Sequence, residues 1–326
     1  MKSILKDIFT AIFMGMVVPG VMLNFGVMLL DAQREASANM PEISTSVTEP
    51  DVPASSMPML FRQEDGTTVQ MDMEAYLLGV VLAEMPAAFE PEALKAQAVV
   101  ARTYTQKAYT TGGKHGDGSV CGTASCCQAY ITEESYLDRG GDLVSVNKIR
   151  QAVLDTSGFV LTYQGELIEA TYFSCSGGMT EDAVAVWGTD FPYLRSVGSP
   201  GEEDALHYTD TVIIPLEEFR SALGLTMEED FENWFTNVSY TAGGGVDTME
   251  IGGKRFRGTE LRTLLGLRST AFTMEMTEEG VQIVTRGYGH RVGMSQYGAD
   301  AMAVNGSLYP EILAYYYHGT KLTHLE

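Results

Sequence analysis

The feature that most constrains this chain is residues 73–105, where two apolar segments are separated by a short turn that contains proline. Apolar residues in Met73–Leu82 recur on nearly every face, which is typical of a helix buried in a core. Pro86 disfavours helical geometry at the residue before it, so this helix is expected to end near Glu84. A second helix is expected to begin at Pro91, because proline is favourable in a first turn.

Glu84 is therefore a candidate general acid. A carboxylate at a helix C-terminus meets the negative end of the helix dipole, and apolar surroundings penalise its charge. Both effects raise its pKa, which is what an acid working near neutral pH requires. The alternative is a solvated residue at a helix end, paired with Lys95 or Arg102 on one face of the second helix.

Three ordered motifs resemble the SpoIID/LytB family, which includes peptidoglycan lytic transglycosylases and amidase enhancers. The first motif, at 76–104, contains Tyr-Leu-x-Gly-Val-Val-x-x-Glu-Met-Pro and then Glu-Ala-Leu-Lys-Ala-Gln-Ala-Val-x-Ala-Arg-Thr-Tyr. The second lies at 171–197, and the third, at 287–299, contains Gly-Met-Ser-Gln. The blocks lie within residues 60–320, and the resemblance implies that Glu84 is the catalytic residue of a transglycosylase.

The implied activity is cleavage of MurNAc–GlcNAc bonds in peptide-free glycan strands with formation of 1,6-anhydroMurNAc. One carboxylate suffices for this reaction because the nucleophile is the C6 hydroxyl of the substrate. Hydrolysis needs two carboxylates about 5 to 10 Å apart, and Glu181 and Asp182 could supply the second one. The non-enzymatic alternative is a LytB-like amidase enhancer, which binds glycan and recruits another hydrolase.

The residues expected to contact glycan come from all three motifs. Basic side chains could bind carboxylates, Tyr172 could stack on a sugar, and a Ser-Gly-Gly turn offers backbone amides that a sugar can approach closely. His290 and Gln296 are expected to line the cleft, with structural hydrogen bonding as the alternative. The full expected set is Lys95, Arg102, Tyr172, Ser176, Gly177, Gly178, His290 and Gln296.

A candidate metal site follows the second helix, with the spacing His115-x5-Cys121-x4-Cys126-Cys127. It resembles the zinc-binding segment of clostridial family members, with Cys126 in place of their second histidine. Three thiolates and an imidazole would form a closed, structural Zn²⁺ site. A disulfide and free thiols are the alternatives, because the compartment is not cytosolic. Cys175 is expected to be a small buried residue rather than a nucleophile.

The chain of 326 residues carries a formal charge of −22, which argues against nucleic-acid binding, because that would need a basic patch. The same charge repels glycans that carry a carboxylate on each muramic acid. Because the field decays over about 8 Å at physiological ionic strength, a local basic lining can overcome this repulsion. Lys95, Arg102, Arg286 and Arg291 are the residues expected to supply it. Arg291 stands at a position that is commonly glycine in the family.

The N-terminal segment indicates the compartment. Ile8–Leu30 contains no charged residue and is long enough to cross about 30 Å of hydrocarbon. Lys2 and Lys6 precede it, which places the rest of the chain outside the cytoplasm. Residues 1–30 are thus expected to form a cytoplasmic tip and membrane anchor, and the Ser/Pro-rich residues 31–58 a flexible linker. A signal peptide cleaved near residue 38 is the alternative.

The expected fold class is α+β, with two lobes around a substrate groove in residues 59–326. The main lobe would comprise 59–202 plus 281–326, and the second lobe 203–280. The local pattern predicts a hairpin at 60–69, paired strands in 159–173, strand-like 238–240 and 249–251, and helices at 216–223, 259–265 and 310–317.

By resemblance, the setting is septal wall remodelling and engulfment during sporulation. The single-pass anchor would hold the protein on the mother-cell membrane, facing the forespore. The expected partners are peptidoglycan glycan strands, the amidase SpoIIP and the membrane protein SpoIIM.

Overall fold

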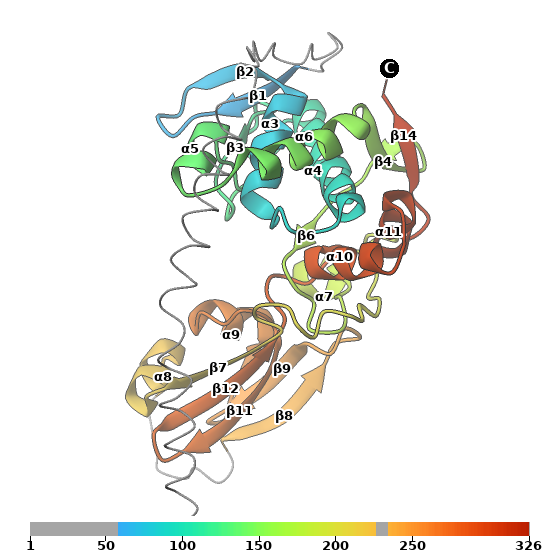
Figure 1. Ribbon diagram of the computed structural model, residues 1–326. Coiled ribbons are helices and arrows are strands. Elements are labelled where there is room, and N and C mark those ends of the chain that lie inside the picture. The colour runs from blue at the N-terminus through green and yellow to red at the C-terminus, as the bar shows by residue number, and fades with distance from the viewer. Residues whose placement is uncertain (1–57, 226–233, 326) are drawn as a thin grey trace, which may run out of the picture. The chain divides into compact units, whose positions relative to one another are not determined.

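The computed structural model describes residues 58–225 and 234–325 (Figure 1). The expected membrane helix and almost all of the expected linker lie outside these described residues. Among the helices that are described, none has the length and apolar character needed to cross a bilayer. The described chain mixes helices with short sheets, which confirms the α+β class.

The helices of the described chain are α3 (Met73–Glu84), α4 (Pro91–Thr111), α5 (Glu133–Asp138), α6 (Leu143–Asp155), α7 (Ala183–Trp187), α8 (Leu216–Leu223), α9 (Gly258–Leu264), α10 (Gln296–Val304) and α11 (Tyr309–Tyr316). The strands are β1 (Pro58–Arg62), β2 (Thr68–Asp72), β3 (Val120–Cys121), β4 (Phe159–Tyr163), β5 (Glu166–Leu167), β6 (Tyr172–Phe173), β7 (Thr209–Ile214), β8 (Phe235–Tyr240), β9 (Val246–Ile251), β10 (Lys254–Arg257), β11 (Ala271–Thr277), β12 (Gly280–Arg286), β13 (Met294–Ser295) and β14 (Lys321–His324).

Two hydrophobic clusters organise these elements. In the first, α4 contacts α3, α6, α10 and α11 (Figure 1). Its alanines let these neighbours approach closely, and every residue of 96–103 is buried. The flanking sheets have the strand orders β2-β1-β3 and β14-β4-β5. This cluster therefore surrounds the helix pair that the sequence singled out.

The second cluster contains β7 to β12 together with α8 and α9. The sheets here have the orders β11-β12-β7 and β10-β9-β8, and all their pairings are antiparallel. Ile283 of β12 belongs to this cluster, although its position falls within the expected main lobe. The division into two lobes around a groove stays a prediction.

Most local predictions are confirmed. The hairpin β1–β2, the paired strands β4 and β5, and helices α8, α9 and α11 occupy the expected segments. Tyr172 and Phe173 differ, because they leave the β4–β5 ladder and pair in parallel with Met294 and Ser295. This pairing joins two of the sequence motifs through backbone hydrogen bonds, and local pattern alone carries no information about it.

A buried ion pair fixes α4 against α3. The Arg102 side chain is fully buried, and its Nη2 lies 2.5 Å from Oε2 of Glu74. The guanidinium also donates to the carbonyls of Val153 and Phe159 at 3.1 and 3.2 Å, while Ser157 Oγ donates to Glu74. All of these partners belong to the protein itself. Arg102 is therefore engaged in holding α3, α4 and β4 together.

We predict that Arg102→Ala lowers the free energy of unfolding by about 3 to 5 kcal/mol, because it leaves the Glu74 carboxylate buried without a partner. Lys95→Ala is the matched control on the same helix. Lys95 pairs with Glu92 and Asp155 at 2.9 and 3.1 Å near the surface, so its loss should cost about 1 kcal/mol or less. Urea denaturation measures both values. Equal effects of the two substitutions would contradict the structural role of Arg102.

Candidate functional site

Glu84 is the last residue of α3. The next residue, Met85, is extended with φ −125° and ψ 140°, as the following proline requires. The Met85 amide donates to the carbonyl of Val81 and so closes the last turn of the helix. The helix end predicted from Pro86 is thus confirmed. The Glu84 side chain is half-buried at this point.

Two neutral donors contact the Glu84 carboxylate. The Ala129 amide donates to its Oε1 at 2.6 Å, and the hydroxyl of Tyr172 also hydrogen-bonds to the carboxylate. Burial raises the pKa of Glu84, and these two hydrogen bonds offset only part of that rise. The alternative in which Glu84 pairs with Lys95 or Arg102 is wrong, because both cations are bound to other carboxylates.

A buried polar chain supports Tyr172. Its hydroxyl shares its single proton between the Glu84 carboxylate and Oε1 of Gln128, which lies 3.2 Å away. Gln128 Nε2 in turn donates to Thr105 Oγ1 at 3.0 Å and to the hydroxyl of Tyr76 at 3.4 Å. Burial, followed by the charge of Glu84, raises the pKa of Tyr172 far above its ordinary value. Tyr172 therefore stays a neutral hydrogen-bond donor beside the carboxylate. Gln128 and Ala129 were not among the expected site residues.

The four expected metal ligands converge on one point. The ligand atoms of His115, Cys121, Cys126 and Cys127 all lie within 4.8 Å of one another. His115 Nε2 lies 3.8 Å from Cys126 Sγ and 3.6 Å from Cys127 Sγ, and the two sulfurs are 3.9 Å apart. Tetrahedral Zn²⁺ with Zn–S bonds of about 2.3 Å needs sulfur separations of about 3.8 Å. The donor set therefore fits a zinc ion.

The thiols of this cluster are unbridged, and all four cysteines of the chain are free. Burial alone would raise the pKa of Cys121. The Thr123 amide and the neighbouring His115, Cys126 and Cys127 outweigh burial and lower that pKa to about 6. Because the thiolate is the form that binds metal, Cys121 is prepared to act as a ligand.

The metal cluster and the candidate acid share one loop. Cys127 is followed by Gln128, which binds Tyr172, and then by Ala129, whose amide binds Glu84. An ion held at Cys127 would therefore fix a backbone donor that stands two residues further on. A cavity of about 790 Å³ is lined by Ala129 and by Ala83, the residue before Glu84, and Tyr130 and Tyr136 form part of its wall.

His290 lies next to β6. Its ring is 5.7 Å from that of Phe173 and 5.2 Å from that of Trp187. Burial, then the charge of Arg262, lowers the pKa of His290 to about 4, although a hydrogen bond with the backbone of Tyr172 raises it. The imidazole is therefore neutral near pH 7. β6 links it to Glu84, since Tyr172 and Phe173 are consecutive.

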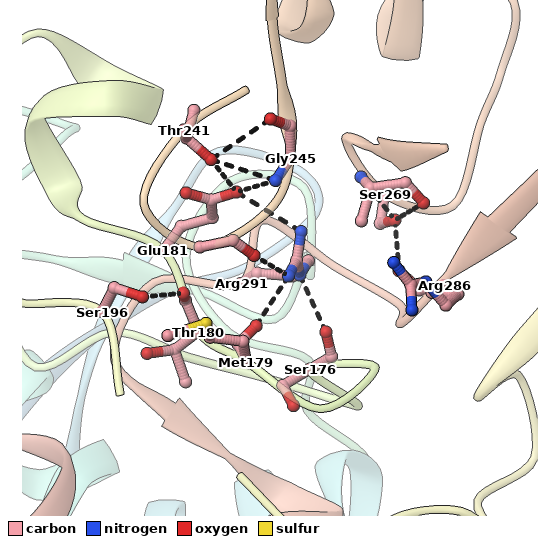
Figure 2. Close-up of polar contacts among 12 residues, drawn as sticks. Ser176, Met179, Thr180, Glu181, Ser196, Thr241, Gly245, Ser269, Arg286 and Arg291 are labelled. Carbon is pink, nitrogen blue, oxygen red and sulfur yellow. Dashed lines mark hydrogen bonds and ion pairs between the residues drawn. The ribbon is translucent and has the colours of Figure 1, made fainter. Parts of the chain in front are cut away.

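Arg291 and Glu181 form a buried network, shown in Figure 2. The Arg291 guanidinium donates to the carbonyls of Ser176, Met179 and Gly243 at 2.7 to 2.8 Å and to Glu181 Oε1 at 3.3 Å. The same Oε1 accepts hydrogen bonds from Thr241 and from the Gly245 amide. Glu181 is fully buried, so it stabilises loops and cannot act as a second catalytic carboxylate.

Arg291 has a φ of +65°, in the left-handed region where glycine is favoured. This matches the glycine that is common at this position among the proteins the motif resembles. Four hydrogen bonds from its side chain to three carbonyls and a carboxylate compensate for the backbone cost. The hydrogen bonds of the network thus stabilise Arg291 at this position, and its side chain offers no donor to a ligand.

Several expected glycan-contacting residues serve the fold instead. The Ser176 amide donates to Glu202 Oε2, and the Gly178 amide donates to Ser176 Oγ. The Gly177 amide hydrogen-bonds to the buried Cys175. Cys175 also donates to Glu202, and burial raises its pKa to about 12, so no activated thiol is present there. Gln296 is buried and contacts Gln97 at 3.5 Å.

Of the expected set, the structure brings Glu84 and Tyr172 together at the zinc-ligand loop, and His290 hydrogen-bonds to the backbone of Tyr172. Six other expected residues have their polar groups bound elsewhere in the protein, namely Lys95, Arg102, Ser176, Gly177, Gly178 and Gln296. We leave these six out of the proposed glycan site. The remaining arrangement is an acid of raised pKa beside a neutral phenol and a cysteine-rich metal cluster, with a neutral imidazole bonded to the backbone of β6.

The fold and site thus define a mixed α+β protein with one partly buried carboxylate held by a candidate zinc loop. Comparison with known proteins gives the family. A model of the SpoIID family, described as stage II sporulation protein, matches residues 62–163. Stage II sporulation protein D of Bacillus subtilis is 36% identical over 81% of this chain and 78% of its own length. The chain belongs to the SpoIID family.

Two further relatives show how far the similarity extends. Stage II sporulation protein D of Bacillus amyloliquefaciens is also 36% identical, over the same shares of both chains. An amidase enhancer of Bacillus subtilis is 31% identical over 76% of this chain, which spans 40% of the enhancer's length. The homologues therefore include both sporulation proteins and an amidase enhancer.

We predict that the purified protein binds one Zn²⁺ per chain, as measured by elemental analysis. Cys127→Ser should remove most of the metal, because a hydroxyl is a far weaker zinc ligand than a thiolate. Cys175→Ser is the matched control and should keep it, since Cys175 lies outside the cluster. The zinc assignment would be refuted if the wild-type protein contained no metal and its cysteines were joined in disulfides.

Proposed function

We propose that this protein is a membrane-anchored peptidoglycan lytic transglycosylase. It would cleave MurNAc–GlcNAc bonds in peptide-free glycan strands and leave 1,6-anhydroMurNAc ends. The observation that carries this proposal is the single carboxylate of Glu84, which is partly buried, is raised in pKa and forms no ion pair with any cation of residues 58–225 and 234–325.

The first step uses Glu84 as the acid. Its proton moves to the glycosidic oxygen as the bond from that oxygen to C1 of muramic acid breaks. Burial favours the protonated form, which an acid must hold before substrate arrives. The Ala129 amide fixes one oxygen of the Glu84 carboxyl group. The side chain therefore keeps one orientation while the proton leaves from the second carboxyl oxygen.

The second step uses the same group as a base. The carboxylate accepts the proton of the muramic acid C6 hydroxyl, and O6 attacks C1 to close the anhydro ring. Glu84 returns to its protonated form and no water is consumed. The donors Ala129 and Tyr172 favour the charged form between the steps. Burial and these two donors account for the pKa of Glu84, and no second carboxylate of the described chain contributes to it.

We propose that glycan contacts Tyr172 and His290 and occupies the cavity lined by Ala83 and Ala129. The tyrosines of that cavity, Tyr130 and Tyr136, are suited to stack on sugar rings. His115, Cys121, Cys126 and Cys127 would hold a structural zinc ion. The ion would supply rigidity alone, because all four of its positions would be taken by protein ligands.

The second candidate is a non-catalytic amidase enhancer that binds glycan and recruits a hydrolase. The relative named amidase enhancer favours it. Under this alternative, Glu84 would be a binding residue and its raised pKa would have no catalytic use. The products formed from glycan strands separate the two functions.

We propose that the protein acts in septal wall remodelling and engulfment during sporulation, as a single-pass protein of the mother-cell membrane facing the forespore. The names of the sporulation relatives support this setting. The peptidoglycan amidase SpoIIP would supply the peptide-free strands, and SpoIIM would be the membrane partner.

We predict that Glu84→Gln lowers the transglycosylase rate by about 10² to 10⁴-fold, because the amide can neither donate nor accept the proton in the reaction. Mass spectrometry of digested peptide-free strands measures the anhydro ends. Glu133→Gln, a surface residue paired with Arg150, is the control and should be active. Reducing ends that contain added water would show hydrolysis, and strands that are bound but uncut would show an enhancer.

We predict that Tyr172→Phe moves the alkaline limb of the pH–rate profile to higher pH. The Tyr172 hydroxyl lowers the pKa of Glu84, so its removal raises that pKa further. Because the reaction starts from protonated Glu84, the rate falls as the pH rises through this pKa, and the fall comes later in the variant. Profiles of kcat/KM against pH measure the shift. Tyr109→Phe, an exposed tyrosine of α4, should leave the limb in place, and a move of the limb to lower pH in the Tyr172 variant would contradict the assignment.

A further inference from the structure

Arg262 of α9 has a guanidinium without a counter-charge. Its Nε is buried and has no hydrogen-bond partner in residues 58–225 and 234–325, and no carboxylate there forms an ion pair with it. Other arginines of the same region are paired, such as Arg268 with Asp210 and Arg220 with Glu217. A partly buried cation with an unpaired donor is costly, and such groups commonly bind an anion.

Backbone hydrogen bonds place this arginine beside the loop that carries His290. The Gly289 amide donates to the carbonyl of Arg268 at 3.0 Å, and the Leu267 amide donates to the carbonyl of Arg262 at 2.9 Å. The end of α9 is thereby joined to the turn before His290. The charge of Arg262 is also one of the causes that lower the pKa of His290.

Two exposed aromatic side chains occur close to His290 in space or in sequence. Trp187 is 42% exposed and its ring is 5.2 Å from His290, while Tyr288 is 40% exposed and its ring lies 5.3 Å from His207 and 5.1 Å from the Arg268 guanidinium. Arg257, at the start of α9, donates to the carbonyl of Ala185 on α7 and so holds α7 against α9. Exposed rings next to an unpaired cation are suited to a sugar that carries a negative charge.

Three of the four basic residues expected to bind the glycan are occupied, and the fourth, Arg286, is exposed at the end of β12. Lys95 is bound to two carboxylates, Arg102 is buried against Glu74, and Arg291 is buried against Glu181 and three carbonyls. A protein of formal charge −22 still needs a local cation to hold an anionic strand. Arg262 is available for that purpose.

We propose that Arg262, Trp187 and Tyr288 form a subsite that binds the free lactyl carboxylate of a muramic acid residue. This inference rests on the proposed function, because the subsite would bind another part of the same glycan strand that Glu84 cleaves. In peptide-bearing strands the lactyl carbonyl is an amide and has no charge. The subsite therefore selects strands from which the peptides have been removed.

The test compares two glycan probes on the full-length protein in detergent, with Glu84→Gln present to prevent cleavage. One probe is peptide-free strands, and the other is the same strands with their lactyl carboxylates converted to methylamides. We expect the parent protein to bind the free acid about tenfold more tightly, as one charge-assisted hydrogen-bonded pair would give. Arg262→Gln should lose this preference and bind the methylamide unchanged.

Two controls keep the result interpretable. Arg220→Gln, a surface arginine of α8, should keep the full preference, and Arg262→Lys should keep part of it. Equal binding of both probes by the parent protein overturns the subsite, whatever the fold of the variants. An unchanged preference in Arg262→Gln overturns it as well.

Failure of the proposed function gives a different result. If protein with native Glu84 forms no anhydro ends while the probe preference depends on Arg262, the subsite stands and the transglycosylase assignment falls. If anhydro ends form and the probes bind equally, the assignment stands and the subsite falls.

Discussion

The hydrogen bond from the Ala129 amide to the Glu84 carboxyl group is the interaction on which the proposed chemistry depends. It holds the acid in one orientation without supplying a charge. A cation in the same place would lower the pKa and remove the proton that the reaction needs. The two cations that the sequence offered as partners of Glu84 bind other carboxylates instead, Arg102 binding Glu74 and Lys95 binding Glu92 and Asp155.

The position of that amide is set by several elements together. Pro86 ends α3 at Glu84, and the cysteine-bearing loop returns to the end of α3. Tyr172 approaches from β6, which is held by its pairing with β13. A donor, an acid and a phenol thus meet although they come from three distant parts of the sequence. Rigidity of this kind keeps a catalytic group within a fraction of an ångström of its working position.

Some of these features could be predicted from the sequence and others could not. The end of α3, the start of α4 and the convergence of four zinc-type ligands follow from local rules about proline, apolar periodicity and ligand type. The role of Arg102 did not follow, because its partner Glu74 lies on another helix and nothing in the spacing reveals burial. Ala129 could not be identified either, since it contributes only a backbone amide, which any residue provides.

The Arg291–Glu181 pair has a consequence for how the chain is made. The two residues are far apart in the sequence, so the carboxylate is synthesised long before its cation. A chain cut short ahead of Arg291 would leave a charged group enclosed with no opposite charge, and the carbonyls of Ser176, Met179 and Gly243 would lose their donor. Loops from three regions can therefore settle only once the chain has been made as far as Arg291, so the synthesis of almost the whole polypeptide is a precondition for this network.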